Sequence, residues 1–330
     1  PFVAKYTPAG ELLWVKAAGS SSSGEEAWGV ITDANKNVYI SGMFSGTATF
    51  GTLQATSQGG QDCFIAKLNP SGEFVWVKSF GGPKNDAASD IDILNGSQLI
   101  VGGYFTDTTI VNGNMILANG GEESYIIKYD LDGNYLDFAT FGSTLADRVY
   151  SVNAGKNNNI FIGGYYYGSI TLGTNTFVSA GERDIYVAEL NSNLTFKWSK
   201  TAGGTDSDYC NDTDIDSLDN LYFTGNFNLT ASFDGQNITS TGDDEIYLAK
   251  LGNNEVPVEL VSFEAVNAGN GKVNLSWITA TETNNSGFAV ERSVDNVTFT
   301  KIGFIEGHGT TTEINNYSFI DQTTDSKVYY

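Results

Sequence analysis

The sequence repeats itself with a period of 61 residues. Four near-copies of one phrase, YISGMF, IVGGYF, FIGGYY and YFTGNF, place a glycine at the same phase, namely Gly42, Gly103, Gly164 and Gly225. A second phrase returns with the same period as CFIAKLN at 63–69, YIIKYDL at 125–131, IYVAELN at 185–191 and IYLAKLG at 246–252. Self-similarity at a fixed period indicates that one supersecondary unit is stacked several times. The period therefore restricts the chain to repeat architectures and identifies a scaffold before it identifies a ligand.

Each copy contains four strand patterns. In the copy at 86–142, strands are expected at 89–94, 98–105, 124–129 and 134–141, with tight turns at Asn95-Gly96 and Asp132-Gly133. A long Gly/Asn/Thr connection is expected between the second and third strands. Four short antiparallel strands with such turns are typical of a propeller blade. We therefore predict an all-β fold: a β-propeller of four-stranded blades, followed by a smaller β-sandwich.

Three positions of the repeat have expected structural roles. The third strand is apolar on both faces, at Phe64 and Ile65 for example, which favours a sheet packed between two neighbouring sheets. At the end of this strand, Lys67 and its equivalent Lys128 are expected to reach solvent along their stems. The recurring glycine is expected where two backbones approach closely or where a bulge bends the strand.

The predicted propeller covers residues 1–252. It divides into a partial blade at 1–16, repeats at about 25–80, 86–142 and 147–204, and a partial blade at 208–252. Third strands number five, whereas the other strands number four each, so the ring is predicted to be incomplete. The simplest expectation is a larger ring with further blades before Pro1, in a window cut from a longer protein.

Composition excludes several classes of partner. The net charge of −22, from 39 acidic and 17 basic residues, repels polyanions, so nucleic acid and anionic membranes are poor partners. Calcium, cationic groups and neutral glycans remain compatible with this charge. No run of 18 apolar residues occurs, so no membrane insertion by a helix is expected. Cys63 and Cys210 fall at different phases of the repeat, and no disulfide between them is expected.

The repeat resembles a known family. The runs GGPKNDAASDIDILNGSQLIVGGYF at 81–105 and DCFIAKLNPSGEFVWVK at 62–78 look like the SBBP-type β-propeller repeat of secreted bacterial proteins. The resemblance covers about residues 1–251 and implies a propeller on a secreted or cell-surface protein. It implies no activity, because such repeats host no common chemistry.

A second module is expected at 253–330, where the 61-residue period stops. Strand patterns at 272–277, 287–293, 299–304, 317–319 and 328–330, with Trp277 in the second strand of the module, resemble a fibronectin type III-like sandwich. The phrases VPVELVSFEA and ERSVDNVTFTKIG look like modules near the C-termini of secreted Bacteroidetes proteins. That resemblance implies type IX secretion. The module is expected to lack its last strand.

Carboxylates recur at two phases of the repeat and suggest metal binding. Glu25, Asp86, Asp147 and Asp208 follow the fourth strand, and Asp62, Glu123, Asp184 and Glu245 precede the third. One hypothesis is a ring of acids on the loop face that holds Ca²⁺ or a cationic ligand. The alternative, which we favour, is that each acid accepts backbone N–H groups in its own blade. Asp212, Asp214 and Asp216 alternate along one strand and are a separate candidate for Ca²⁺.

Two functional hypotheses follow. The only histidine, His308, is expected in a surface loop of the second module, so no catalytic triad can form in the propeller. The preferred hypothesis is a non-catalytic scaffold that recognises a glycan or a surface protein, with Trp28, Tyr166 and Tyr167 as an exposed patch that stacks on sugars. The alternative is a polysaccharide hydrolase or lyase. A non-repeating pair of acids or tyrosines in the central channel would favour the alternative.

Overall fold

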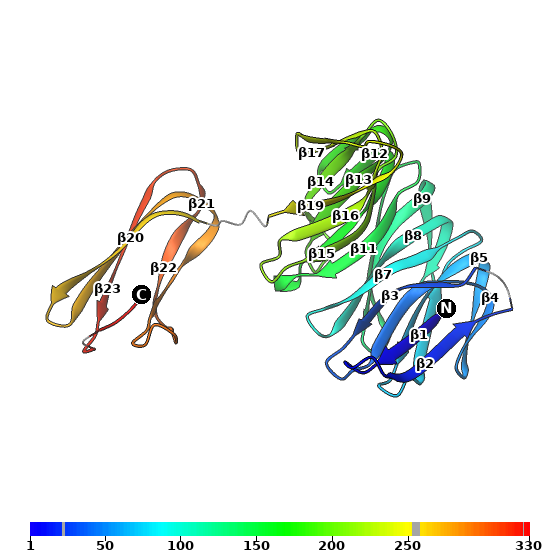
Figure 1. Cartoon of the computed structure of the whole chain (residues 1–330), viewed down its shortest axis with the longest axis horizontal. Helices are drawn as coiled ribbons and strands as arrows, with labels where there is room; N and C mark the ends of the chain where they lie inside the picture. Colours follow the sequence, from blue (N-terminus) through cyan, green and yellow to red (C-terminus); the bar gives the residue numbers. More distant parts are fainter. Residues whose placement is uncertain (22–23, 253–257, 326) are drawn as a thin grey trace. The chain divides into compact units, whose positions relative to one another are not determined.

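The computed structural model describes residues 1–21, 24–252, 258–325 and 327–330. The chain divides into two compact units, Pro1–Leu251 and Gly252–Tyr330 (Figure 1). The predicted start of the second module, at 253–257, lies outside the described residues. Strands dominate both units, and no helix in the described ranges is long and apolar enough to cross a membrane.

The first unit consists of four blades that follow the 61-residue period. Blade 1 contains β3 (Glu26–Thr32), β4 (Val38–Phe50), β5 (Leu53–Leu68) and β6 (Phe74–Phe80). Blade 2 contains β7 (Ala87–Leu94), β8 (Gln98–Val111), β9 (Asn114–Asp130) and β10 (Tyr135–Phe141). Blade 3 contains β11 (Arg148–Ala154), β12 (Ile160–Leu172), β13 (Asn175–Leu190) and β14 (Phe196–Gly204), with a 3₁₀ turn at Lys156–Asn158. Blade 4 contains β15 (Tyr209–Ile215), β16 (Leu221–Phe227) and β19 (Glu245–Leu251), with a hairpin of β17 (Thr230–Phe233) and β18 (Gln236–Thr239). Two strands, β1 (Phe2–Tyr6) and β2 (Leu12–Gly19), precede blade 1.

The first strands of successive blades pack side by side. β3 contacts β7, β7 contacts β11 and β11 contacts β15 (Figure 1). β6 and β10 form the opposite edges of their sheets, whereas β14 pairs further with β17 of the blade 4 hairpin. This arrangement places the first strands around the channel of a β-propeller and confirms the predicted fold.

The third strand is buried on both faces in the three complete blades, as predicted. Phe64 and Ile65 of β5 are fully buried, and so are Tyr125 and Ile126 of β9. The equivalent face of β19 differs. Leu248 is 76% exposed, because no described residue forms a further blade on that side.

The long connection predicted between the second and third strands is wrong. These residues form the continuation of a hairpin: β8 pairs with β9 as far as Val111 and Asn114, and Asn112 and Gly113 turn the chain with positive φ. An Asn-Gly turn favours such a two-residue hairpin loop. Its extended end also meets the chain directly after the fourth strand of the preceding blade, in the bridge between Gly81 and Ile110. The segment therefore links neighbouring blades.

The lysines at the end of the third strand do not reach solvent as expected. Lys67 and Lys128 are only 9% and 7% exposed. Their ammonium groups donate hydrogen bonds to the carbonyl oxygens of Leu131 and Ser192, which lie in the turn before the fourth strand of the next blade. A buried ammonium is tolerated there because a backbone acceptor satisfies it.

The recurring glycine lies against a backbone carbonyl, as predicted. A Cβ atom on Gly103 would lie 1.9 Å from the carbonyl oxygen of Ala87, and one on Gly164 would lie 1.9 Å from that of Arg148. The register of the facing first strand shifts by one residue directly beside this contact, between Ala88 and Asp90 in blade 2. Such a shift is a β-bulge, in which one residue leaves the regular pairing. Only glycine leaves room for the carbonyl that the bulge displaces.

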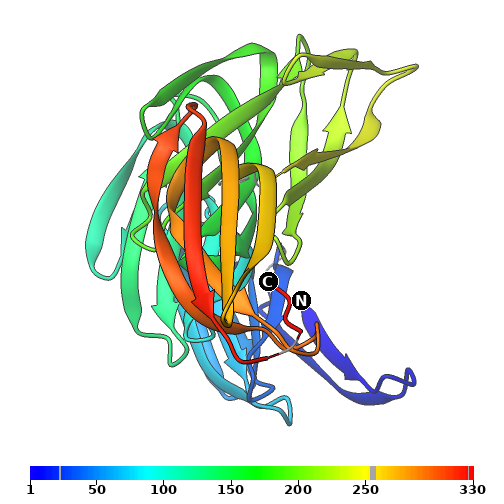
Figure 2. The same cartoon turned by 90° about the vertical axis from the view of Figure 1, so that its left-hand side faces the viewer.

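The second unit is built on β20 (Val258–Gly269), β21 (Lys272–Arg292), β22 (Thr300–Thr311) and β23 (Asn315–Gln322). Figure 2 shows these strands, coloured yellow to red, side by side. The strands predicted separately at 272–277 and 287–293 are one strand. The first part of β21 pairs with β20 and β23, and its second part pairs mainly with β22. Trp277 is in the first part and Phe288 in the second, and their ring centres lie 5.3 Å apart in the core.

His308 lies in a strand and not in the predicted loop. Its backbone N–H donates to Glu282 Oε2 at 3.0 Å, and its Nδ1 lies 2.6 Å from the hydroxyl of Tyr317. The Tyr317 hydroxyl donates in turn to Glu282 Oε1 at 2.5 Å. Burial raises the pKa of Glu282, but the hydrogen bonds from Tyr317 and its other donors outweigh burial and lower it to about 2. The group is therefore a hydrogen-bonded anchor of the second unit.

Replacing the recurring glycine should destabilise the propeller strongly. We expect Gly103→Ala to lower the free energy of unfolding by about 3 kcal/mol, because the new methyl group would overlap the carbonyl of Ala87. Urea denaturation followed by near-UV circular dichroism measures this. Gly242→Ala, where the methyl group would meet no atom within 4 Å, is the control and should change stability little. Equal losses in the two variants would contradict the proposed role of the contact.

Candidate functional site

The four bulges place one residue each at the mouth of the channel. These residues are Trp28, Ser89, Tyr150 and Asn211, which are spaced 61 apart and lie at the register shifts of β3, β7, β11 and β15. All four line one cavity of about 500 Å³ together with Asp90, Tyr104, Arg148 and Asp212. The bulge therefore turns equivalent positions of four blades toward a common space.

The residues at the mouth differ from copy to copy, whereas the framework does not. The bulge position holds Trp, Ser, Tyr and Asn in the four blades, while the glycine opposite the bulged strand is present in all four. A residue that the fold requires recurs with the repeat. A side chain that the fold does not require is free to serve recognition. The mouth is therefore the part of the propeller where the copies carry individual chemistry.

Arg148 is held at the mouth by a carboxylate and an aromatic ring. Its Nε and Nη2 donate to Glu122 Oε2 and Oε1, both at 2.6 Å, and its guanidinium lies 3.9 Å from the ring centre of Tyr104. Burial lowers the pKa of Arg148, but the hydrogen bonds with Glu122, together with the electrostatic interactions with Tyr165, Tyr104 and Glu122, shift it upward. The bidentate pair fixes the side chain and neutralises its charge.

A series of tyrosine and arginine side chains continues from Arg148 into blade 4. The guanidinium of Arg183 lies 5.4 Å from the ring centre of Tyr165 and 5.9 Å from that of Tyr209. Tyr165 and Tyr209 are themselves in edge-to-face contact at 5.3 Å. Arg183 and Tyr209 occupy the positions that Glu122 and Arg148 hold one repeat earlier. The same two positions thus make an ion pair at one junction and a cation–π contact at the next.

Two carboxylates from different blades share one hydroxyl group. Ser151 Oγ lies 3.1 Å from Asp90 Oδ2 and 3.0 Å from Asp212 Oδ1. Asp90 also accepts the backbone N–H of Val152 at 2.9 Å, which ties blade 2 to blade 3. Burial, and to a smaller extent the charge of Asp212, raises the pKa of Asp90 to about 6, against the hydrogen bonds that it accepts. The mouth therefore holds two acidic groups no more than about 6 Å apart, of which one is largely desolvated.

Ser89 presents a polar atom without a partner to the same cavity. Its side chain is 7% exposed, and its hydroxyl oxygen makes no hydrogen bond with any described residue. Buried polar atoms are nearly always paired, so each exception needs an explanation. Because Ser89 lines the cavity, a bound ligand can supply the missing partner.

The acids of the predicted ring, at positions 25, 86, 147 and 208, do not form an exposed ring that faces the mouth. Asp86, Asp147 and Asp208 are fully buried. Asp86 accepts the backbone N–H groups of Gly82 at 2.7 Å and Thr106 at 3.1 Å, and Asp147 and Asp208 repeat this arrangement. The more exposed Glu25 accepts the backbone N–H of Ser20 at 3.0 Å. The carboxylates thus hold the turn between blades, as the favoured alternative described.

The second set of acids lies beside the first. Asp184 and Asp208 both lie against Gly203. A Cβ atom on this glycine would be 2.5 Å from Asp184 Oδ1 and 3.0 Å from Asp208 Oδ2, so the two carboxyl groups are close neighbours. Asp184 accepts the backbone N–H of Ala180 at 2.8 Å, and its Oδ1 has no hydrogen-bond partner among the described residues. Burial, with the charge of the neighbouring acid adding to it, raises the pKa of Asp184 to about 6. Each blade junction of this kind therefore buries two carboxyl groups.

The structure does not gather the separate calcium candidates. Asp212 bonds Ser151, Asp214 accepts the backbone N–H of Ile215, and Asp216 accepts the N–H groups of Leu218 and Asn220 in a turn. In the described ranges, no group of three or more His, Cys, Asp and Glu side chains is placed to hold a metal ion. Calcium binding at these residues stays a prediction.

The sugar-stacking patch predicted from Trp28, Tyr166 and Tyr167 is wrong. Trp28 is 44% exposed at the mouth, but Tyr166 is 1% exposed and belongs to the core between blades 2 and 3. Tyr167 is half-buried where the blade 3 hairpin extends beyond the sheet. Adjacent residues of a strand point to opposite faces, so Tyr166 and Tyr167 cannot share one patch.

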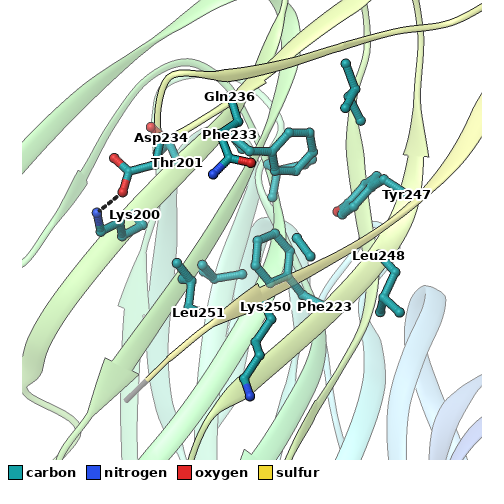
Figure 3. A pocket seen from close by; sticks show the side chains of 15 residues that line it. Lys200, Thr201, Phe223, Phe233, Asp234, Gln236, Tyr247, Leu248, Lys250 and Leu251 are labelled. Carbon is teal, nitrogen blue, oxygen red and sulfur yellow. Dashed lines mark hydrogen bonds and ion pairs between the residues drawn. The ribbon is translucent and has the colours of Figure 1, made fainter. Parts of the chain in front are cut away.

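A second cavity of about 350 Å³ lies between blades 3 and 4. Figure 3 shows the rings of Phe223, Phe233 and Tyr247 around it, with the ion pair of Lys200 and Asp234 at 2.9 Å on its rim. In blades 1 to 3 a fourth strand covers the edge of the third, but β19 pairs only with β16 among the described strands. The cavity is thus lined by β19, whose second edge no described strand covers.

Comparison with known proteins supports the fold. The chain is 24% identical over 212 residues to an uncharacterised WD repeat-containing protein of Acanthamoeba polyphaga mimivirus. The match covers 55% of this chain and 15% of the viral protein. WD repeats form four-stranded propeller blades, which agrees with the structure described above. No protein-family model matches the sequence.

Most of the residues at the mouth were not predicted from the sequence. Trp28 and Asp212 were predicted as site residues, each for a different reason, but Ser89, Tyr104 and Arg148 were not. A signal was present, because the position of Trp28 holds a different residue in each copy. This variation could not be interpreted from the sequence, because only the bulge in the structure shows that the position faces the channel.

Buried carboxyl groups should make propeller stability depend on pH. Burial raises the pKa of Asp86 to about 8 and those of Asp147 and Asp208 to about 6, above the value of about 3.9 in an unfolded chain. Protonation therefore favours the folded unit, and its contribution declines from about pH 4 and is lost by about pH 6 to 8. We expect the melting temperature of the propeller to fall between pH 5 and pH 8, as measured by calorimetry.

Two variants distinguish this effect from general charge repulsion. Asp147→Asn should reduce the slope of melting temperature against pH, because an amide does not titrate. Asp107→Asn, which removes an exposed acid, should leave the slope nearly unchanged. Equal effects of both substitutions would show that the buried carboxyl groups are not the cause.

Proposed function

We propose that this protein is a non-catalytic binding scaffold whose ligand site is the channel mouth. The observation that carries the proposal is the contrast between the repeated framework and the unrepeated side chains that line one cavity. Trp28 and Tyr150 offer aromatic surface, and Asn211 and Asp212 offer polar groups around it. Aromatic walls with a few placed polar groups are typical of sites for glycans and for protein side chains.

We also propose that the protein acts outside the cell or on its surface. The support is the resemblance of the repeat to secreted bacterial propellers, together with the strong negative charge that keeps such proteins apart in solution. The glycan or surface protein that it recognises would then be extracellular.

One observation favours the alternative, a polysaccharide hydrolase or lyase. Asp90 and Asp212 hold the same position of the repeat in blades 2 and 4, and their separation of no more than about 6 Å is compatible with a glycosidase. Asp90 has a structural role, however, because it accepts the N–H of Val152 in the next blade. Asp92 accepts the N–H of Ala154 in the same way. We therefore prefer the binding function.

The proposal predicts retention of a ligand that depends on the mouth. In a glycan and surface-protein array with the intact chain, we expect Trp28→Ala to reduce binding about tenfold by removing a stacking surface. Tyr6→Ala removes a ring that is 58% exposed on β1 and should leave binding unchanged. Equal melting temperatures would show that both variants are folded.

Release of shortened or unsaturated saccharide from an array ligand, lost in Asp212→Asn, would contradict the binding proposal and support the enzyme. Binding that survives Trp28→Ala unchanged would place the ligand elsewhere on the molecule.

A further inference from the structure

We infer that the channel mouth accepts a cationic group, namely the guanidinium or ammonium of a basic side chain in a peptide. The inference rests on the proposed binding function and specifies the class of ligand. Three features of the cavity carry it: the charge balance between its two acids and its neutralised arginine, the free aromatic surface beside a carboxylate, and the oxygen atoms without a hydrogen-bond partner.

The first feature is the balance of charge. Asp90 and Asp212 line the cavity, and in the described part of the chain neither forms an ion pair with a lysine or arginine. Arg148 is the cation of this lining, and Glu122 compensates it through two hydrogen bonds of 2.6 Å. The cavity therefore keeps an uncompensated negative charge. The net charge of −22 strengthens the attraction of a cation from a distance.

The second feature is a precedent inside the mouth. The guanidinium of Arg148 lies 3.9 Å from the ring centre of Tyr104 and forms an ion pair with the carboxylate of Glu122. A ring face and a carboxylate together make a suitable cage for a cation. Trp28 and Tyr150, with Asp212, offer the same combination of groups on the same cavity without an internal cation in it.

The third feature is the set of hydrogen-bond acceptors. Asp212 is exposed, and its Oδ2 accepts no hydrogen bond from the described residues, while Oδ1 accepts from Thr213 N–H and from Ser151. Ser89 Oγ is buried and unpaired. These oxygens match a ligand that donates several hydrogen bonds, as guanidinium and ammonium groups do. A carboxylate or phosphate ligand would instead meet the two acids.

Binding of short peptides by the intact chain tests the inference. The probes are acetylated, amidated pentapeptides Gly-Gly-X-Gly-Gly with a fluorescent label, where X is arginine, lysine, citrulline or glutamate. Citrulline has the shape of arginine without its charge. We expect the arginine or lysine peptide to bind, the citrulline and glutamate peptides to bind at least tenfold more weakly, and binding to weaken as salt is added. The stronger of the two basic peptides identifies the preferred cation.

Matched variants locate the site. We expect Asp212→Asn and Trp28→Ala each to weaken binding of the basic peptide about fivefold, and Ser89→Ala to weaken it a few-fold. Asp214→Asn removes an exposed acid two residues further along β15 that does not line the cavity, and it should leave the affinity unchanged. The variants of exposed residues should melt at the temperature of the original protein.

Three outcomes would overturn the inference. Equal binding of the citrulline and arginine peptides would exclude a role for charge. Equal losses of peptide affinity in Asp212→Asn and Asp214→Asn would indicate attraction by the overall negative charge and not binding at one site. Failure of all basic peptides, while a neutral oligosaccharide binds in a Trp28-dependent manner, would overturn the cationic ligand but leave the binding function intact. Turnover of a saccharide at the mouth would instead overturn the proposed function itself.

Discussion

The close contact between a glycine and a backbone carbonyl determines how each blade is built. In all four blades the glycine of the second strand faces a carbonyl oxygen of the first strand at a distance that admits no side chain. The carbonyl is displaced because the first strand bulges at the next positions. The bulge in turn directs one side chain per blade into the channel mouth. The close contact of the glycine with the carbonyl thus accompanies the bulge, and the bulge supplies the position in each blade that is free to contact a ligand.

Framework and recognition are separated in this propeller. The buried acids hold the turns between blades, the lysines of the third strand bind the turn of the next blade, and the extended hairpins join neighbouring sheets. None of these contacts involves the residues that line the mouth. Asp90 of the mouth has a structural contact of its own, because it accepts the N–H of Val152 in the next blade. Substitutions at the bulge positions therefore affect few contacts that stabilise the fold, and the copies have diverged there.

Periodicity allowed the architecture to be predicted, since a repeat fixes strand order and the burial of the third strand without further information. Contacts between copies were harder to predict. The solvent role assigned to Lys67 was wrong because its acceptor, Leu131, is 64 residues away in the sequence. Tyr166 was assigned to a patch because its burial depends on the packing of blade 2 against blade 3. The mouth was missed for the same reason: its residues come from four blades and are related only through the bulges.

The outer face of blade 4 has a consequence for the behaviour of the protein in solution. Ile246 and Leu248 are 88% and 76% exposed on β19, whose second edge is unpaired among the described strands. An apolar edge strand is a template for pairing with another chain. The charge of −22 opposes such encounters at low ionic strength, but its range shrinks to about 10 Å at 0.1 M salt. Added salt therefore favours pairing of two chains through this edge, whereas dilute buffers oppose it.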